Sequence, residues 1–187
     1  MKIDGNTIKV GNILNYEGRL WSVLKTQHTQ PGKGGAYMQV EMKTLQGSTK
    51  TNVRFRSSEQ VEKVSLEERP YQYLYVDGDQ VVFMDQKNYE QINIPMEIVG
   101  NSFDFLKDEM IVSIKFYEET PLDVLLPDNV VLKIQEAEPV VKGQTASSSF
   151  KPAILENGVK IMVPQHIGSG MDVVVNVIDR TYVERAK

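Results

Sequence analysis

One lysine stands among rigid and small residues near the start of the chain, in the run Pro31, Gly32, Lys33, Gly34 and Gly35. Proline fixes its own φ, and glycine reaches backbone conformations that other residues avoid, so the run favours an exposed loop. Lysine ends in a primary amine, which carries a point charge and can be acylated. The pattern predicts a narrow probe with a reactive tip at Lys33. A flexible surface loop that happens to carry a lysine has the same composition and stays an open alternative.

A second group of cations follows the loop. Arg54 and Arg56 are two residues apart, so on a strand they share one face and Phe55 takes the other. Lys43 precedes the neighbouring turn. Such a face could contact RNA phosphates, with an affinity that depends on salt and hardly on sequence. Solvated strand charge explains the same residues equally well.

Charge is distributed unevenly along the 187 residues, whose net value is −4. Residues 1–64 carry a net +5, residues 65–128 a net −10 and residues 129–187 a net +1. Because salt screens charge within about 8 Å, each segment presents its own field. A basic first segment could meet phosphate while the acidic middle is kept away from it, although segments can also differ in charge by chance.

The groups that catalysis or metal binding would need are missing. The chain has no cysteine and two histidines, His28 and His166, so it can form neither a thiolate nor a histidine metal cluster. The stretch from Gly32 to Gly34 lacks the upstream glycine and the following Ser or Thr of a phosphate-binding loop. We therefore expect no catalytic residue, no metal site and no bound cofactor.

The elements that must position the lysine loop are short strands. Four apolar runs in the first third indicate two hairpins, and the loop lies between them. Four or five short strands with one long loop predict a small SH3-like barrel over residues 1–64. The runs are residues 13–16, 20–24, 37–42 and 51–55.

The rest of the chain also favours strands. In residues 65–128 strands precede and follow a short helix, the order of an OB-type barrel. That helix begins near Pro95, and Gly100 keeps it short. Residues 129–187 contain a further run of strands. The predicted fold class is all-β, with three small β-barrel domains in series.

Three motifs, in this order and at these separations, resemble the elongation factor P family along essentially the whole chain. The first is the lysine loop, which Ala36 and the aromatic Tyr37 follow. The second begins with Lys151, Pro152 and Ala153 and ends at Val163 and Pro164, with Gly158 between them. The third is the C-terminal Tyr182, Val183, Glu184 and Arg185.

The resemblance implies a KOW/SH3-like barrel followed by two OB-fold barrels, in an outline that imitates transfer RNA. Members of the family bind the ribosome, contacting both subunits, beside peptidyl-tRNA and relieve stalling at consecutive prolines. On this basis Lys33 would reach toward the peptidyl-transferase centre, and the protein would be a non-enzymatic factor that works as a monomer.

The resemblance also implies further site residues. A lysine-modifying enzyme often extends the tip residue, so a covalent modification of the β-lysyl type is expected on Lys33. Tyr182 and Arg185 match the C-terminal motif and are candidate RNA contacts. In the third domain the family often has Gly-Asp-Thr-Ala, whereas this chain has Gln144 in place of the aspartate. Thr145 and Ser147 are therefore carried over only as weak candidates.

A general OB-type RNA-binding protein is the alternative interpretation. Such proteins stack bases on exposed aromatic side chains, and Tyr71, Tyr73 and Tyr75 would share one strand face. Their segment carries the net −10, which has the wrong sign for binding phosphate. No apolar run approaches the ~20 residues of a membrane helix, and the N-terminus does not resemble a secretory signal, so we expect a cytoplasmic protein without a membrane partner.

Overall fold

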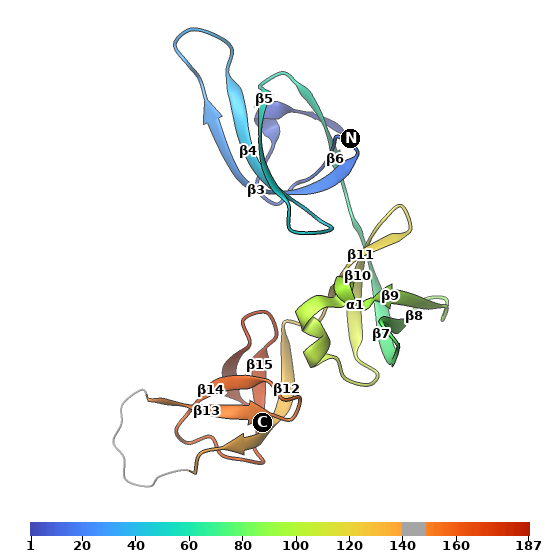
Figure 1. Cartoon of the computed structure of the whole chain (residues 1–187), viewed down its shortest axis with the longest axis vertical. Helices are drawn as coiled ribbons and strands as arrows, with labels where there is room; N and C mark the ends of the chain where they lie inside the picture. Colours follow the sequence, from blue (N-terminus) through green and yellow to red (C-terminus); the bar gives the residue numbers. More distant parts are fainter. Residues whose placement is uncertain (140–148) are drawn as a thin grey trace. The chain divides into compact units, whose positions relative to one another are not determined.

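The computed structural model describes residues 1–139 and 149–187, and these residues are mostly β (Figure 1). Within them, three antiparallel sheets follow one another along the chain, which confirms the predicted all-β class. The chain divides into two compact units. The N-terminal unit contains Met1–Glu67 and Phe116–Leu122, and the C-terminal unit contains Glu68–Lys115 and Asp123–Lys187. The domain boundaries after residues 64 and 128 stay predictions.

The first sheet has six strands and closes almost into a barrel in the order β1-β6-β2-β3-β4-β5 (Figure 1). Alternate residues of its strands point inward, and Leu14, Val40, Met42 and Phe55 are at most 1% exposed. The 3-10 helix η1 (Gly5–Thr7) packs on β4 and β5. The strands are β1 (Lys2–Asp4), β2 (Ile13–Tyr16), β3 (Arg19–Thr29), β4 (Tyr37–Thr44), β5 (Lys50–Arg56) and β6 (Gln60–Val64).

Gly5 lies where η1 approaches the end of β5 most closely. A Cβ added there would lie 2.4 Å from the backbone oxygen of Arg56, far inside van der Waals contact. We expect Gly5→Ala to lower the free energy of unfolding by about 1–3 kcal/mol, because backbone must move to admit the methyl group. Chemical denaturation checks this. In the control Gly32→Ala the new methyl meets no atom within 4 Å, so its stability should stay within about 0.5 kcal/mol; equal losses in both variants would contradict the packing argument.

The middle sheet has the order β11-β10-β7-β8-β9. After β9 the chain enters α1 (Met96–Val99), which ends at Gly100, whose φ is +64°, and η2 (Gly100–Phe105) follows. The predicted short helix is therefore confirmed, and its last turn is of the 3-10 type. The strands are β7 (Glu67–Asp77), β8 (Gln80–Asp85), β9 (Gln91–Pro95), β10 (Ile111–Tyr117) and β11 (Thr120–Leu125).

Asp85 organises the turn between β8 and β9. Its carboxylate is buried and accepts a 2.7 Å hydrogen bond from the backbone N–H of Lys87. That hydrogen bond, helped by the N–H of Asn88 and the hydroxyl of Tyr71, holds the pKa of Asp85 below its usual value, against the opposing effect of burial. The ionised form of Asp85 therefore stabilises the folded state.

We expect Asp85→Asn to lower the thermal midpoint at neutral pH. A depressed carboxyl pKa adds stability above the unfolded value of about 3.9, and this stability is lost as the pH falls through the folded pKa. The midpoints of the variant and the parent should therefore converge in acid when followed by circular dichroism. Asp79→Asn removes an exposed aspartate and serves as the control. A midpoint difference for Asp85→Asn that stays constant with pH would contradict the argument.

The C-terminal sheet has the order β14-β13-β12-β15-β16, and its core includes a residue from outside the sheet. Phe105 of η2 is 1% exposed and belongs to the same apolar cluster as Leu132, Val163 and Val175. Arg180 donates hydrogen bonds to the oxygen of Asn101 (2.7 Å) and to Asp104 (3.0 Å). The strands are β12 (Asn129–Ala137), β13 (Phe150–Leu155), β14 (Lys160–Pro164), β15 (Asp172–Asn176) and β16 (Thr181–Arg185).

Candidate functional site

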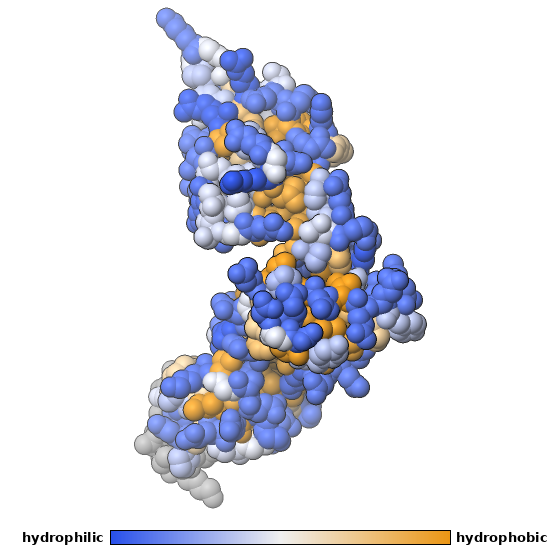
Figure 2. All heavy atoms as spheres, turned by 45° about the vertical axis from the view of Figure 1, so that its right-hand side comes forward, coloured by the Kyte–Doolittle hydropathy of each residue, from blue (hydrophilic) through white to orange (hydrophobic). Residues whose placement is uncertain are grey.

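The lysine loop extends the longest hairpin of the barrel. Strands β3 and β4 stay paired as far as Thr29 and Tyr37, and residues 30–36 join them. The Ser57 N–H donates a 3.0 Å hydrogen bond to the Ala36 oxygen and fixes the base of the loop. Figure 1 shows the loop beyond the barrel wall, and in Figure 2 it forms the hydrophilic projection at the top of the view.

The tip of the loop is open on all sides. Lys33 is exposed, and no hydrogen bond or ion pair holds its ammonium group within the part of the chain that the structure describes. Added Cβ atoms at Gly32 and Gly35 would meet nothing within 4 Å. Gly34 has φ +112°, a value that residues with a side chain rarely adopt. The loop therefore presents one free amine on a slender support.

The prediction that Arg54 and Arg56 share a face is confirmed. Both are exposed on β5, and Phe55 between them is 1% exposed in the core. Arg56 lies opposite Tyr37 at the base of the loop, and Lys43 lies opposite Lys50 farther along the hairpin. Cationic side chains thus lie along the outward face of β4 and β5, from the β4–β5 turn to the base of the lysine loop.

A fifth cation joins this face because β3 contains a bulge. The register between β3 and β4 shifts between Val23 and Lys25, so Val23 is buried opposite Met42 whereas Lys25 is exposed opposite Glu41. Sequence reasoning missed Lys25, since uninterrupted alternation would put it on the core side with Val23. We define the basic face as Lys25, Lys43, Lys50, Arg54 and Arg56. In the paired positions of β3, β4 and β5, Glu41 is the one acidic side chain.

Arg54 is held in place by an aromatic ring. Its guanidinium carbon lies 4.3 Å from the ring centroid of Tyr37, a cation–π contact. Tyr37 is the first residue of β4 after the lysine loop. One aromatic side chain therefore connects the base of the loop to the basic face and limits the freedom of the arginine that it carries.

The C-terminal candidates belong to the other unit. Tyr182 packs, partly buried, against the core of the C-terminal sheet, and Arg185 is exposed opposite Val173. Thr145 and Ser147 lie outside the described residues. Of the predicted site residues, the structure brings together the lysine loop, Lys43, Arg54 and Arg56.

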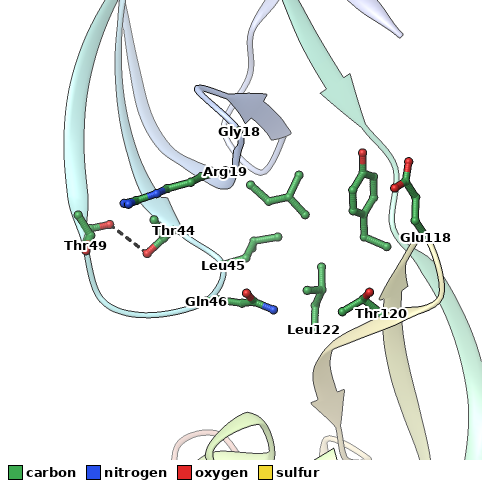
Figure 3. Close-up of a pocket in the computed structure, with 11 residues that line it drawn as sticks. Gly18, Arg19, Thr44, Leu45, Gln46, Thr49, Glu118, Thr120 and Leu122 are labelled. Atoms are coloured by element: carbon green, nitrogen blue, oxygen red, sulfur yellow. Dashed lines mark hydrogen bonds between the residues drawn. The ribbon is translucent and has the colours of Figure 1, made fainter.

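A pocket of about 500 Å³ lies in the N-terminal unit beneath the barrel turns (Figure 3). Gly18 and Arg19 come from the end of β2–β3, Leu45 and Gln46 from the β4–β5 turn, and Glu118 and Leu122 from the β10–β11 hairpin. Leu45 and Leu122 point into the space, and Thr44 donates a hydrogen bond to the Thr49 oxygen at its side (Figure 3). Its mixed lining contains no facing pair of acids or bases of the kind that proton transfer requires.

A general RNA-binding barrel would use a face of exposed tyrosines, and β7 does not present such a face. Tyr71 is 3% exposed, whereas Tyr75 is 51% exposed. The register of β7 shifts between Tyr73 and Tyr75, so the bulge ends the alternation that the sequence suggested. The expectation of a shared Tyr71, Tyr73 and Tyr75 face is therefore wrong. Among the described residues there is also no group of three or more metal-binding side chains.

Comparison with protein families gives three matches that together cover nearly the whole chain. The KOW-like domain of elongation factor P matches residues 4–61. The OB domain of elongation factor P matches residues 66–124, and its C-terminal domain matches residues 130–185. The first barrel and the middle sheet are therefore of the KOW and OB types, as expected.

Individual proteins give the same result. The chain is 60% identical to elongation factor P of Erythrobacter litoralis and 58% identical to that of Zymomonas mobilis, over 186 residues and the full length of both partners in each pair. Among solved structures, eukaryotic translation initiation factor 5A from Methanococcus jannaschii is similar with a TM-score of 0.56 and 23% identity. That match covers 66% of this chain and 95% of the other, and it concerns the fold alone.

Proposed function

The chain belongs to the elongation factor P family and is a non-enzymatic translation factor, and we infer that its partner is the ribosome. From this premise we propose that it binds beside peptidyl-tRNA, directs the lysine loop toward the peptidyl-transferase centre and relieves stalling at consecutive prolines. The observation that carries the proposal is the free, exposed amine of Lys33 on a loop whose glycines leave it unobstructed.

The loop suits a crowded active centre made of RNA. Its glycines add no side-chain bulk, so the segment that enters is little wider than a backbone, while Lys33 adds reach and a positive charge. Proline is a poor partner in peptide-bond formation because its ring restricts the conformation of its own backbone. A factor that holds the peptidyl-tRNA in a reactive position lowers the entropic part of the barrier without supplying a catalytic group.

The basic face supplies the complementary contact. Its five cations lie on β3 and β4, the hairpin that carries the loop, and on β5, which pairs with β4, so phosphates of an RNA held there would fix the direction of the tip. The acidic middle segment, with a net −10, would be repelled by the same phosphates. Tyr182, Arg185, Thr145 and Ser147 remain candidate RNA contacts, carried by the family resemblance.

A covalent extension of Lys33 fits the same site. The amine is exposed and free of partners in the described part of the chain, so a modifying enzyme has open access to it. We propose a β-lysyl-type group, which would lengthen the arm and add positive charge beyond the glycine loop. The protein would act as a monomer in the cytoplasm, where ribosomes work. No helix among the described residues is both long and apolar enough to cross a membrane.

A reconstituted translation assay tests the proposed function. Ribosomes translate two messages that differ by a run of three prolines, with and without the purified protein. We expect the protein to speed synthesis across the prolines and to leave the proline-free message unchanged. Equal effects on both messages, or no effect on either, would contradict the proposal.

Removing two cations from the basic face should weaken ribosome binding. We expect the double variant Arg54→Gln, Arg56→Gln to bind less tightly and to lower the slope of log affinity against log salt by about one for each phosphate that is no longer neutralised. Fluorescence titration with ribosomes at several salt concentrations measures both effects. The double variant Lys2→Gln, Lys9→Gln removes the same charge from outside the face, so an equal change there would show that net charge alone matters.

A further inference from the structure

A groove of about 530 Å³ crosses the middle sheet, far along the chain from the lysine loop. Its apolar lining comes from β7, the start of β10, and the end of β11 with the two residues that follow it: Pro70, Ile111, Val112, Leu125, Leu126 and Pro127. Ile111 is 46% exposed and Leu125 is 36% exposed. Figure 2 shows apolar side chains gathered at the surface of the middle sheet. Exposed apolar side chains that line a common groove usually mark an interaction site.

The groove is built from fixed parts. Ile111 and Leu125 project outward from strands in which the adjacent residues, Val112 and Val124, are 3% and 2% exposed in the core. At the far end, the Val177 N–H donates a 2.9 Å hydrogen bond to the Asp128 oxygen, just after Pro127. A partner would therefore meet a surface that is already formed, which lowers the entropic cost of binding.

Carboxylates surround this apolar lining. Glu68 and Asp128 line the groove, and Asp123 precedes Leu125 by two residues on the outward face of β11. Two cations lie beside these three carboxylates: Arg69, which also lines the groove and bonds Tyr71, and Lys115, which lies 3.7 Å from Glu68. The carboxylates therefore exceed the cations by one. The segment around them carries a net −10. The groove therefore favours a positively charged partner and disfavours RNA, whose phosphates would be repelled.

We propose that this groove docks a lysine- and arginine-rich segment of a ribosomal protein, with an apolar side chain of that segment between Ile111 and Leu125. The proposal rests on the ribosome-binding function proposed above and adds a protein contact to its RNA contacts. The lysine loop and the basic face would engage RNA, while the middle sheet would engage protein. The charge difference between the first and middle segments would then sort the two kinds of partner.

Photo-crosslinking tests the proposal directly. The photoreactive residue p-benzoylphenylalanine replaces Leu125 in one variant and Gln39, which is exposed on β4 beside Arg54, in another. Each variant is bound to ribosomes and irradiated, and adducts are identified by mass spectrometry. We expect position 125 to yield peptides rich in lysine and arginine from a ribosomal protein, and position 39 to yield RNA.

The other outcomes are also decisive. Adducts of position 125 with RNA or with a second copy of the chain would overturn the docking proposal. If position 39 reacts and position 125 gives no adduct, the docking proposal is also overturned. The ribosome-binding function would stand in that case. If neither position reacts, both proposals fail.

An affinity measurement gives independent evidence. We expect the double variant Ile111→Ser, Leu125→Ser to bind ribosomes about tenfold more weakly, since it lacks two exposed apolar anchors. The double variant Val131→Ser, Ile178→Ser removes apolar side chains that are 48% and 80% exposed elsewhere on the same unit and should bind normally. Equal affinity of the groove variant and the parent, with both folded by circular dichroism, would overturn the proposal.

Discussion

Replacing Lys33 with alanine is expected to abolish the acceleration of translation through consecutive prolines while leaving the fold intact. The side chain is exposed and has no partner within the described residues, so its loss should change the free energy of unfolding by less than about 0.5 kcal/mol. The loop would still enter the ribosome, but it would carry no amine at its tip. Activity on the three-proline message and chemical denaturation measure the two parts of this prediction.

Two companion variants make the result specific to the amine. Lys9→Ala removes an exposed lysine from elsewhere on the same barrel and should keep full activity. Lys33→Arg keeps the positive charge but replaces the primary amine with a guanidinium group, so activity in that variant would mean that charge alone suffices. Undiminished activity of Lys33→Ala would count heavily against a role for the loop tip.

The largest expected effect on stability comes from Phe105→Ala. Phe105 is 1% exposed in the apolar cluster of the C-terminal sheet, although it lies on η2, which precedes that sheet in the sequence. The Arg180 guanidinium carbon lies 5.3 Å from its ring centroid, and the same guanidinium group bonds Asp104 beside it. Removing a buried phenylalanine leaves a cavity, so we expect the free energy of unfolding to fall by about 3–5 kcal/mol.

Urea denaturation followed by circular dichroism measures this loss. Phe103→Ala is the matched control, because Phe103 lies on the same 3-10 helix and is only half-buried. It should cost clearly less than Phe105→Ala. Similar losses in the two variants would mean that Phe105 does not act by filling the C-terminal core. A loss concentrated in Phe105 would support the middle and C-terminal sheets as parts of one cooperative unit, as their shared cluster indicates.

Local patterns predicted the loop and the alternation of β5 because each depends on neighbouring residues alone. The glycines around Lys33 have backbone freedom of their own, and Arg54, Phe55 and Arg56 follow the two-residue period of any strand. Both features appear in the structure. The end of α1 at Gly100 is of the same kind, because glycine readily takes the positive φ found there.

Bulges and long-range contacts could not be predicted in this way. One extra residue near Lys25 turns that lysine outward, and another between Tyr73 and Tyr75 ends a shared aromatic face. Nothing in the local composition marks either position, since a bulge depends on pairing with a neighbouring strand. The burial of Phe105 in the C-terminal core likewise depends on residues that follow it by 25 or more positions.

Directed cleavage of ribosomal RNA tests the central claim that the lysine loop reaches the peptidyl-transferase centre. The chain has no cysteine, so Gly35→Cys creates a unique attachment point for an iron chelate, at a site where an added Cβ would meet nothing within 4 Å. Met162→Cys, at a residue 52% exposed on β14 of the C-terminal unit, serves as the control. On ribosomes stalled at consecutive prolines, we predict cleavage at the acceptor end of peptidyl-tRNA from position 35 and not from position 162. Cleavage from position 35 that spares the acceptor end, on ribosomes that carry the protein, would contradict the account.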